Sequence, residues 1–260
     1  MPDLNDIPAA LFCSLLFAAL LGAVELGHWL GRRLPASGWE AISSPFLSLT
    51  GASMGLLGLL LAFSFSMGLT RYEARKVVIL KEANALAAAQ ARSDFLQPEA
   101  AQRVKALLRD YLDSRLAYHG ATAESPLADQ LFKQAQALQA RIWAQASVPA
   151  NYRDPAPANF SALTSALNDM AAMRNERRYA IENQIPSSVI VLLVFVTLQA
   201  TAMAGFAFGA NRRRIWLALL GFPLVISLVI YTILDLDRPT RGWILVDQTP
   251  MLDLKASLAP

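Results

Sequence analysis

Long uncharged stretches of apolar and small residues alternate with polar segments along the chain. Four stretches lack Lys, Arg, Asp and Glu over roughly the length of a membrane span: Ala9–Val24, Ala41–Thr70, Asn183–Asn211 and Ile215–Leu234. A helix needs about 20 residues to cross the hydrocarbon core of a bilayer, so the first span must continue through Glu25 and His28 to Leu30. No alternating strand pattern appears, and backbone amides in lipid must be bonded within their own segment. The sequence therefore predicts an all-α membrane protein with four transmembrane helices.

The polar segment between the second and third stretches has the periodicity of a helical bundle. Residues 71–95 contain neither Gly nor Pro, so they are predicted to continue the second span as one helix to about Phe95. Further helices, each with apolar residues on one side, are predicted over 98–120, 125–149 and 160–184. These helices need a shared apolar core, so the segment should form a compact domain standing on the membrane.

The order of these segments predicts the domain organisation. Residues 1–70 should hold transmembrane helices 1 and 2, and 71–185 should form the polar helical-bundle insert. Residues 186–234 should hold transmembrane helices 3 and 4, and 235–260 should be a C-terminal tail.

Composition narrows the function classes. Hydrophobic residues make up 55% of the chain and charged residues only 17%, which disfavours a water-soluble enzyme. The net charge of +3 is too small to indicate binding to nucleic acid. One cysteine and two histidines cannot form a disulfide framework or a zinc cluster within one chain. No nucleotide loop or catalytic constellation is present, so we expect neither an enzyme nor a bound cofactor or metal.

The second stretch carries small and hydroxyl residues that permit two interpretations. A stripe of small residues at helical spacing predicts close packing of another helix: Gly51, Gly55, Gly58 and Ala62. Hydroxyls and aromatic rings on other faces also suit a water-facing pore wall with an apolar constriction: Ser48, Ser53, Phe63, Ser64 and Ser66. Helix packing is the simpler interpretation, and both require a partner helix or an oligomer.

Charged residues near the membrane ends define two further candidate sites. Glu25 and His28 lie one turn apart and fit either a proton path or a headgroup-level pair with a following arginine. Four residues should form a structural polar cluster near the membrane surface: Arg75, Glu82, Asp237 and Arg238. Arg75 and Glu82 are two turns apart on one helix face, and an even number of spans places the exit from the fourth span on the same side of the bilayer. Ion attraction by a charged ring or local pairing at a helix end would also fit Asp237 and Arg238.

The short connections between spans indicate an orientation. Arg32 and Arg33 follow the first span, and Arg212, Arg213 and Arg214 follow the third. The positive-inside rule places both loops in the cytoplasm and the insert outside it. Basic residues also flank the insert, but basic residues next to a long inserted domain have less influence on orientation under this rule.

Three segments resemble the bestrophin-like family of membrane proteins known as the DUF4239 domain. They are the glycine-rich span 51–68, the segment Glu82-Ala83-Asn84-Ala85 and the exit motif Leu236-Asp237-Arg238-Pro239 with Gly242. The likeness covers nearly the whole chain, although Thr240 and Arg241 stand where the family commonly has Phe and Ser. It implies a distant relationship to bestrophins, which are pentameric ligand- or calcium-gated anion channels. We also expect a bacterial inner-membrane location. No EF-hand loop is present, so the sequence does not support calcium gating.

Two function classes fit these features. In the first, a homo-oligomer in the lipid bilayer forms a ring around the second span and conducts small ions passively. In the second, the chain is a membrane-anchored sensor or scaffold whose helical insert binds a partner protein. A continuous axial opening would favour the first class, and an exposed apolar patch on the insert would favour the second.

Overall fold

The computed structural model describes residues 8–121, 125–154, 156–212, 216–238 and 242–258, and its regular elements are helices. In chain order they are α1 (Ala9–Arg33), α2 (Ala36–Arg92), η2 (Ser93–Phe95), α3 (Pro98–Gly120), α4 (Pro126–Ala146), η3 (Pro149–Asn151), α5 (Pro157–Glu182), α6 (Ser187–Ala210), α7 (Trp216–Asp237) and α8 (Thr249–Ser257). Within these ranges, extended pairing is limited to an isolated bridge between Leu96 and Tyr152. The all-helical prediction is confirmed for the described residues.

Four segments are long and apolar enough to cross a membrane, as the sequence predicted. They lie within Ala9–Arg33, Ala36–Phe95, Pro157–Ala210 and Leu219–Asp237. The prediction that the second span continues as one helix to about Phe95 is also confirmed, because α2 runs unbroken to Arg92 and the turn η2 follows. Pro45 lies inside this helix without ending it.

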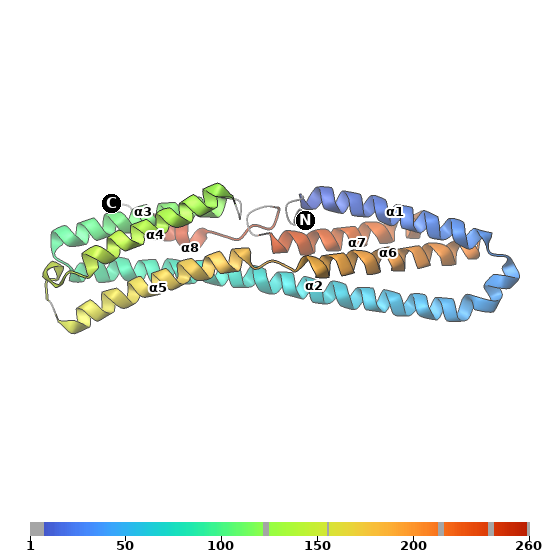
Figure 1. Ribbon diagram of the computed structural model, residues 1–260, viewed down its shortest axis with the longest axis horizontal. Coiled ribbons are helices and arrows are strands. Elements are labelled where there is room, and N and C mark those ends of the chain that lie inside the picture. The colour runs from blue at the N-terminus through green and yellow to red at the C-terminus, as the bar shows by residue number, and fades with distance from the viewer. Residues whose placement is uncertain (1–7, 122–124, 155, 213–215, 239–241, 259–260) are drawn as a thin grey trace. The chain divides into compact units, whose positions relative to one another are not determined.

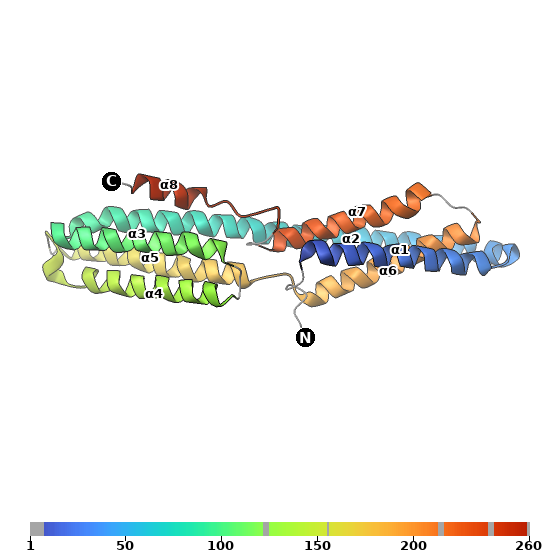
Figure 2. The same ribbon diagram turned by 90° about the horizontal axis from the view of Figure 1, so that it is seen from above.

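The chain divides into two compact units. Unit 1 comprises Met1–Thr70 and Ile185–Arg238, and unit 2 comprises Arg71–Gln184 and Pro239–Pro260. In unit 1, α1 packs chiefly on α6 and also on α7, and Figures 1 and 2 show these helices running side by side. Aliphatic side chains from α1, α2, α6 and α7 form its core, including Leu20, Leu57, Leu193 and Ile230.

Glycines set the close spacing of α1 and α6. A β-carbon on Gly27 would overlap the carbonyl oxygen of Ala202, and one on Gly205 would overlap the carbonyl oxygen of Val24. One turn further on, Gly31 and Gly209 make equally close approaches to the backbone of the opposite helix. Small residues four apart on both helices allow the two backbones to meet, as is common between membrane helices.

Unit 2 is a helical bundle with its own apolar core. Helix α3 packs on α4, and α4 packs on α5 (Figure 2). The part of α2 beyond Thr70 adds Ile79, Leu86 and Ala89 to this core, where they join buried residues such as Leu108 and Leu163. The apolar periodicity of the sequence thus corresponds to the buried faces of the bundle.

The C-terminal residues differ from the expected tail. Helix α7 extends to Asp237, and Thr249–Ser257 form the additional helix α8. Met251 is fully buried in the core of unit 2, and Val246 before it is buried there as well. Nine residues carry too little apolar periodicity to indicate a helix on their own, and burial of Met251 supplies the missing stabilisation.

Candidate functional site

The apolar part of α2 contacts little of its own chain. Only 6% of its most hydrophobic window is buried, compared with 28–50% for the other three candidate spans. Ser48, Gly55, Ala62 and Ser66 are separated by seven, seven and four residues, so they share one face of the helix, and all four are exposed. This face of small and hydroxyl-bearing residues is available to a ligand, to lipid or to another subunit.

The predicted pore residues separate into two groups. Ser48 and Ser66 lie on the exposed face, and Phe63 beside them has 62% of its surface exposed. Ser53 instead points towards α6, where its hydroxyl contacts the Met203 sulfur at 3.7 Å. Ser64 is 3% exposed within unit 1. Ser48, Phe63 and Ser66 are therefore accessible in a single chain, whereas Ser53 and Ser64 pack against other residues of the same chain.

The predicted packing stripe has no partner within the described part of its own chain. A β-carbon added at Gly51, Gly55 or Gly58 would meet no heavy atom within 4 Å, and Ala62 is exposed. A helix contact at this stripe must therefore come from a second molecule. Among the described residues, the glycines that bring two helix backbones closest together are Gly27 and Gly31 of α1 and Gly205 and Gly209 of α6, which the sequence analysis did not select.

A buried ionic cluster occupies the centre of unit 2. Glu82 of α2 is fully buried and accepts hydrogen bonds from Arg115 Nε of α3 at 2.5 Å and Arg177 Nη1 of α5 at 2.8 Å. The Tyr111 hydroxyl donates a longer bond of 3.4 Å to the same carboxylate. Arg115 is 0% exposed and Arg177 is 2% exposed. One carboxylate thus serves two buried guanidiniums from two other helices.

The electrostatics of the cluster keep its groups in fixed protonation states. Burial alone raises the pKa of Glu82, but the charges and hydrogen bonds of Arg115 and Arg177 outweigh it and leave that pKa below its usual range. Burial, together with the nearby Glu82 charge, raises the pKa of Tyr111, so its hydroxyl remains a neutral donor. Burial and the Arg177 charge lower the pKa of His119 to about 4, which leaves this imidazole neutral at pH 7.

The predicted polar cluster of Arg75, Glu82, Asp237 and Arg238 contributes residues to both units. In unit 2, Arg75 donates from Nε to the Ala180 carbonyl at 2.9 Å and from Nη2 to the Asn183 carbonyl at 3.2 Å. These bonds satisfy carbonyls that the C-terminal end of α5 leaves without helical partners.

In unit 1, a side chain at the end of α7 forms a hydrogen bond with the backbone just before α6. The Asp237 carboxylate accepts a hydrogen bond of 2.8 Å from the Ile185 amide. Asp237 is 3% exposed and Arg238 is 9% exposed. The three hydrogen bonds described for Arg75 and Asp237 are therefore made with backbone of the last turn of α5 or of the segment between α5 and α6.

The sequence analysis missed the arginines that complete the buried cluster. Arg115 lies four residues after Tyr111 on the apolar stripe of α3, and Arg177 lies seven residues after Met170 on the stripe of α5. A charged residue at a position that periodicity assigns to the core signals a buried ion pair, and this signal was available in the sequence.

The remaining candidates, Glu25 and His28, belong to unit 1. His28 is buried at the α1–α6 contact, whereas Glu25 is exposed on α1. Among the described residues, no group of three or more His, Cys, Asp and Glu side chains could hold a metal ion.

Comparisons with known proteins give one family match and several matches of fold. A family model for the Bestrophin-like domain matches residues 18–251. The fold is similar to a crystal structure of a bacterial bestrophin homolog from Klebsiella pneumoniae with a point mutation, with a TM-score of 0.63, 12% identity and coverage of 96% of this chain and 98% of that chain. A second mutant of that homolog matches with a TM-score of 0.57 and 14% identity, over 94% of this chain and 97% of the other. A crystal structure described as a membrane protein gives a TM-score of 0.58, 14% identity and the same coverage. No curated protein matches the chain.

Proposed function

The chain belongs to the Bestrophin-like family, and from this premise we propose that it forms a homo-oligomeric channel that conducts small ions passively. Bestrophins are ion channels. Within the family we assign the chain to the DUF4239 group, on the resemblance of its glycine-rich span, its Glu82 segment and its exit motif.

The exposed face of α2 is the observation that carries this proposal. An isolated chain leaves the second span almost uncovered, although the other spans are packed on one another. The uncovered face carries small residues and hydroxyls, which suit a helix that lines a water-filled axis shared by several subunits. In this arrangement Ser48 and Ser66 face the pore and Phe63 narrows it, and the small residues of the glycine stripe on the same side of α2 let the helices of neighbouring subunits pack closely around the axis.

Burial also indicates which of the predicted pore residues do not line the proposed pore. Ser53 and Ser64 point into their own subunit, so we propose that they stabilise the packing of α2 rather than contact ions. The buried Glu82 cluster serves the stability of unit 2, because its carboxylate is fully enclosed and already bonded.

We place unit 2 outside the bilayer as an insert between the second and third spans. The arginines of the α1–α2 and α6–α7 connections favour the cytoplasmic side for those short loops, which puts unit 2 on the opposite face of a bacterial inner membrane.

Cysteine accessibility in liposomes tests the proposal. The chain has one cysteine, Cys13, which is buried, so the background reaction with a charged thiol reagent should be low. Purified protein should release trapped ions faster than empty liposomes do, and a charged thiol reagent should reduce this flux in Ser66→Cys. Leu15→Cys is the control, because Leu15 is 61% exposed but lies on α1 and not on the helix proposed to line the pore.

Two results would contradict a channel lined by α2. One is flux no greater than that of empty liposomes, which would favour the membrane-anchored scaffold. The other is unchanged flux through Ser66→Cys protein whose complete modification has been verified by mass spectrometry.

A further inference from the structure

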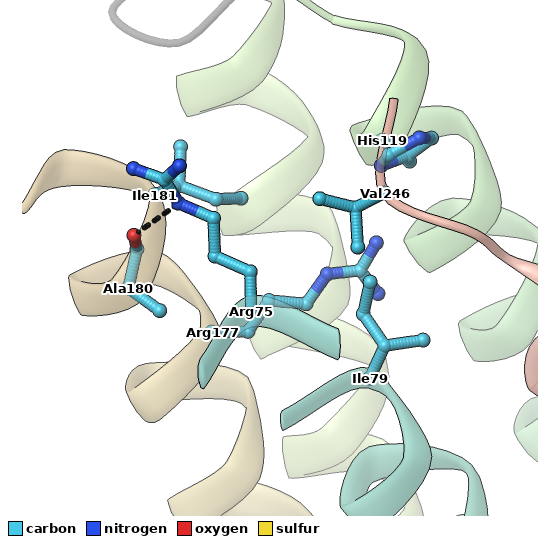
Figure 3. A pocket seen from close by; sticks show the side chains of 7 residues that line it. All are labelled: Arg75, Ile79, His119, Arg177, Ala180, Ile181 and Val246. Atoms are coloured by element: carbon cyan, nitrogen blue, oxygen red, sulfur yellow. Dashed lines mark hydrogen bonds between the residues drawn. The ribbon is translucent and has the colours of Figure 1, made fainter. Parts of the chain in front are cut away.

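A small cavity in unit 2 lies beside the buried ionic cluster and outside the proposed pore. It is lined by Arg75, Ile79, His119, Arg177, Ala180, Ile181 and Val246 (Figure 3). The volume of this cavity is about 10 Å³. This is close to the least volume that holds one water molecule, so the cavity fits a single monatomic ion or one water.

The polar side chains around the cavity carry donors, and the one lining carbonyl drawn in Figure 3, that of Ala180, already accepts a hydrogen bond from Arg75 Nε at 2.9 Å. Two of its lining residues are arginines, and none of the seven carries a carboxylate. His119 is neutral at pH 7 because burial and the Arg177 charge lower its pKa to about 4, and a neutral imidazole still has one N–H to donate. Figure 3 shows the Arg177 guanidinium beside Ile79 and Val246, with the His119 ring near Val246. The cavity thus offers positive charge and hydrogen-bond donors at an apolar wall.

Arg177, which lines this cavity, has one hydrogen-bond donor that lacks a partner among the described residues. Its Nη1 bonds Glu82 and its Nη2 bonds Gln248 Oε1 at 3.0 Å. Its Nε is buried and has no hydrogen-bond partner among the described residues. An unsatisfied donor on a buried charged group is costly, which indicates that a ligand completes its bonding.

The charge of the cluster selects an anion over water. Glu82 supplies one negative charge to Arg115 and Arg177, so these three fully buried groups carry a net charge of +1. Water can accept a hydrogen bond from Arg177 but cannot neutralise that charge, whereas a halide can do both.

We propose that this cavity binds a single halide ion, chloride under ordinary conditions, held by Arg177 with His119 as a second donor. The ion is a buried counterion that stabilises the helical bundle of unit 2. It lies in a different unit from the α2 face, so the inference does not depend on whether the protein conducts ions.

Thermal unfolding of the full-length protein in detergent tests the site. At constant ionic strength and pH 7.5, sodium chloride is exchanged for sodium gluconate, whose anion is too large for the cavity. Above the dissociation constant, a ligand that binds only the folded state should raise Tm by about 3–6 °C for each tenfold rise in chloride. Equal Tm values in the two salts would overturn the proposal.

Two variants localise the effect. Val246→Met fills the cavity without removing a charge, so chloride should no longer change its Tm. Arg178→Gln removes a half-buried arginine next to Arg177 in the sequence that does not line the cavity, and it should keep the full chloride dependence. A chloride effect that persists in Val246→Met would place the halide elsewhere and contradict the assignment.

Bromide provides a direct measurement that requires no variant. Crystals of the wild-type protein grown in bromide should give an anomalous peak next to Arg177 Nε. Full-occupancy water density without anomalous signal at that position would overturn the proposal, even if Val246→Met protein fails to fold.

Discussion

Gly27 of α1 and Ala202 of α6 lie so close that a β-carbon on Gly27 would overlap the Ala202 carbonyl oxygen. Backbone atoms cannot rotate away as a side chain can, so relief of this overlap requires the helices to separate. The contact that joins the first and third spans therefore depends on the absence of a side chain at Gly27 and at the three other glycines that make the same approach, Gly31, Gly205 and Gly209.

Gly27→Ala should lower the stability of the protein by about 1–3 kcal/mol, the usual cost of forcing extra atoms into a packed core. The measurement is thermal unfolding in detergent. Gly22→Ala is the matched control on the same helix, because a β-carbon there meets nothing within 4 Å. If both variants unfold at the wild-type temperature, the α1–α6 contact is looser than described.

Gly55→Leu tests the exposed face of α2. No atom of the chain lies within 4 Å of a β-carbon at this position, so the subunit should fold normally. The larger side chain should prevent close approach of a neighbouring subunit and shift the particle to a smaller mass by light scattering. Gly22→Leu introduces the same side chain at an open position of α1 and should retain the wild-type mass. An unchanged mass for Gly55→Leu would exclude this glycine from the interface.

Glu82→Gln should destabilise the protein by about 3–5 kcal/mol, because it leaves Arg115 and Arg177 buried without their counter-charge. Chemical unfolding of the full chain measures the loss. Glu73→Gln removes an exposed carboxylate from the same helix, whose pair with Lys76 should be worth at most about 1 kcal/mol. Equal stability of the two variants would show that the buried cluster is not required for folding.

The lowered pKa of His119 predicts how the stability of the protein depends on pH. Its folded-state pKa of about 4 lies below the ordinary value of 6.5, so below pH 6.5 the unfolded chain binds a proton that the folded chain does not. Stability should therefore be highest above pH 6.5 and decline as the pH falls towards 4. His119→Gln should have a flatter profile between pH 6.5 and 5, where few carboxylates titrate. Parallel profiles for the two proteins would contradict this assignment.

Asp237→Ala should reduce stability and leave ion selectivity unchanged. The substitution removes the buried acceptor of the Ile185 amide, and an unsatisfied buried amide costs about 1–3 kcal/mol. Asp237→Asn keeps an oxygen in place and should recover part of the loss. If Asp237→Ala instead folds like the parent but conducts different ions, the residue lies in the ion path.

Some features could be predicted from local sequence because they depend on one segment at a time. Uncharged runs of membrane length determined the four candidate spans, and the absence of Gly and Pro after Thr70 determined the unbroken helix α2. A helix satisfies its own backbone, so composition and length suffice to specify it. The same periodicity marked the buried faces of the bundle, including positions that Arg115 and Arg177 occupy.

Only the tertiary structure decided which of several similar glycine pairs and charged residues form contacts. Glycines four apart occur on α1, α2 and α6, but only the pairs on α1 and α6 meet, because contact requires a complementary surface on a second helix. Glu82 could have joined Arg75 on its own helix, yet its carboxylate bonds arginines from α3 and α5. Helix α8 likewise forms where Met251 packs into the apolar core of unit 2. Sequence determined the helices and their apolar faces, and packing between distant segments determined the partners, since a side chain's neighbours depend on residues far from it in the chain.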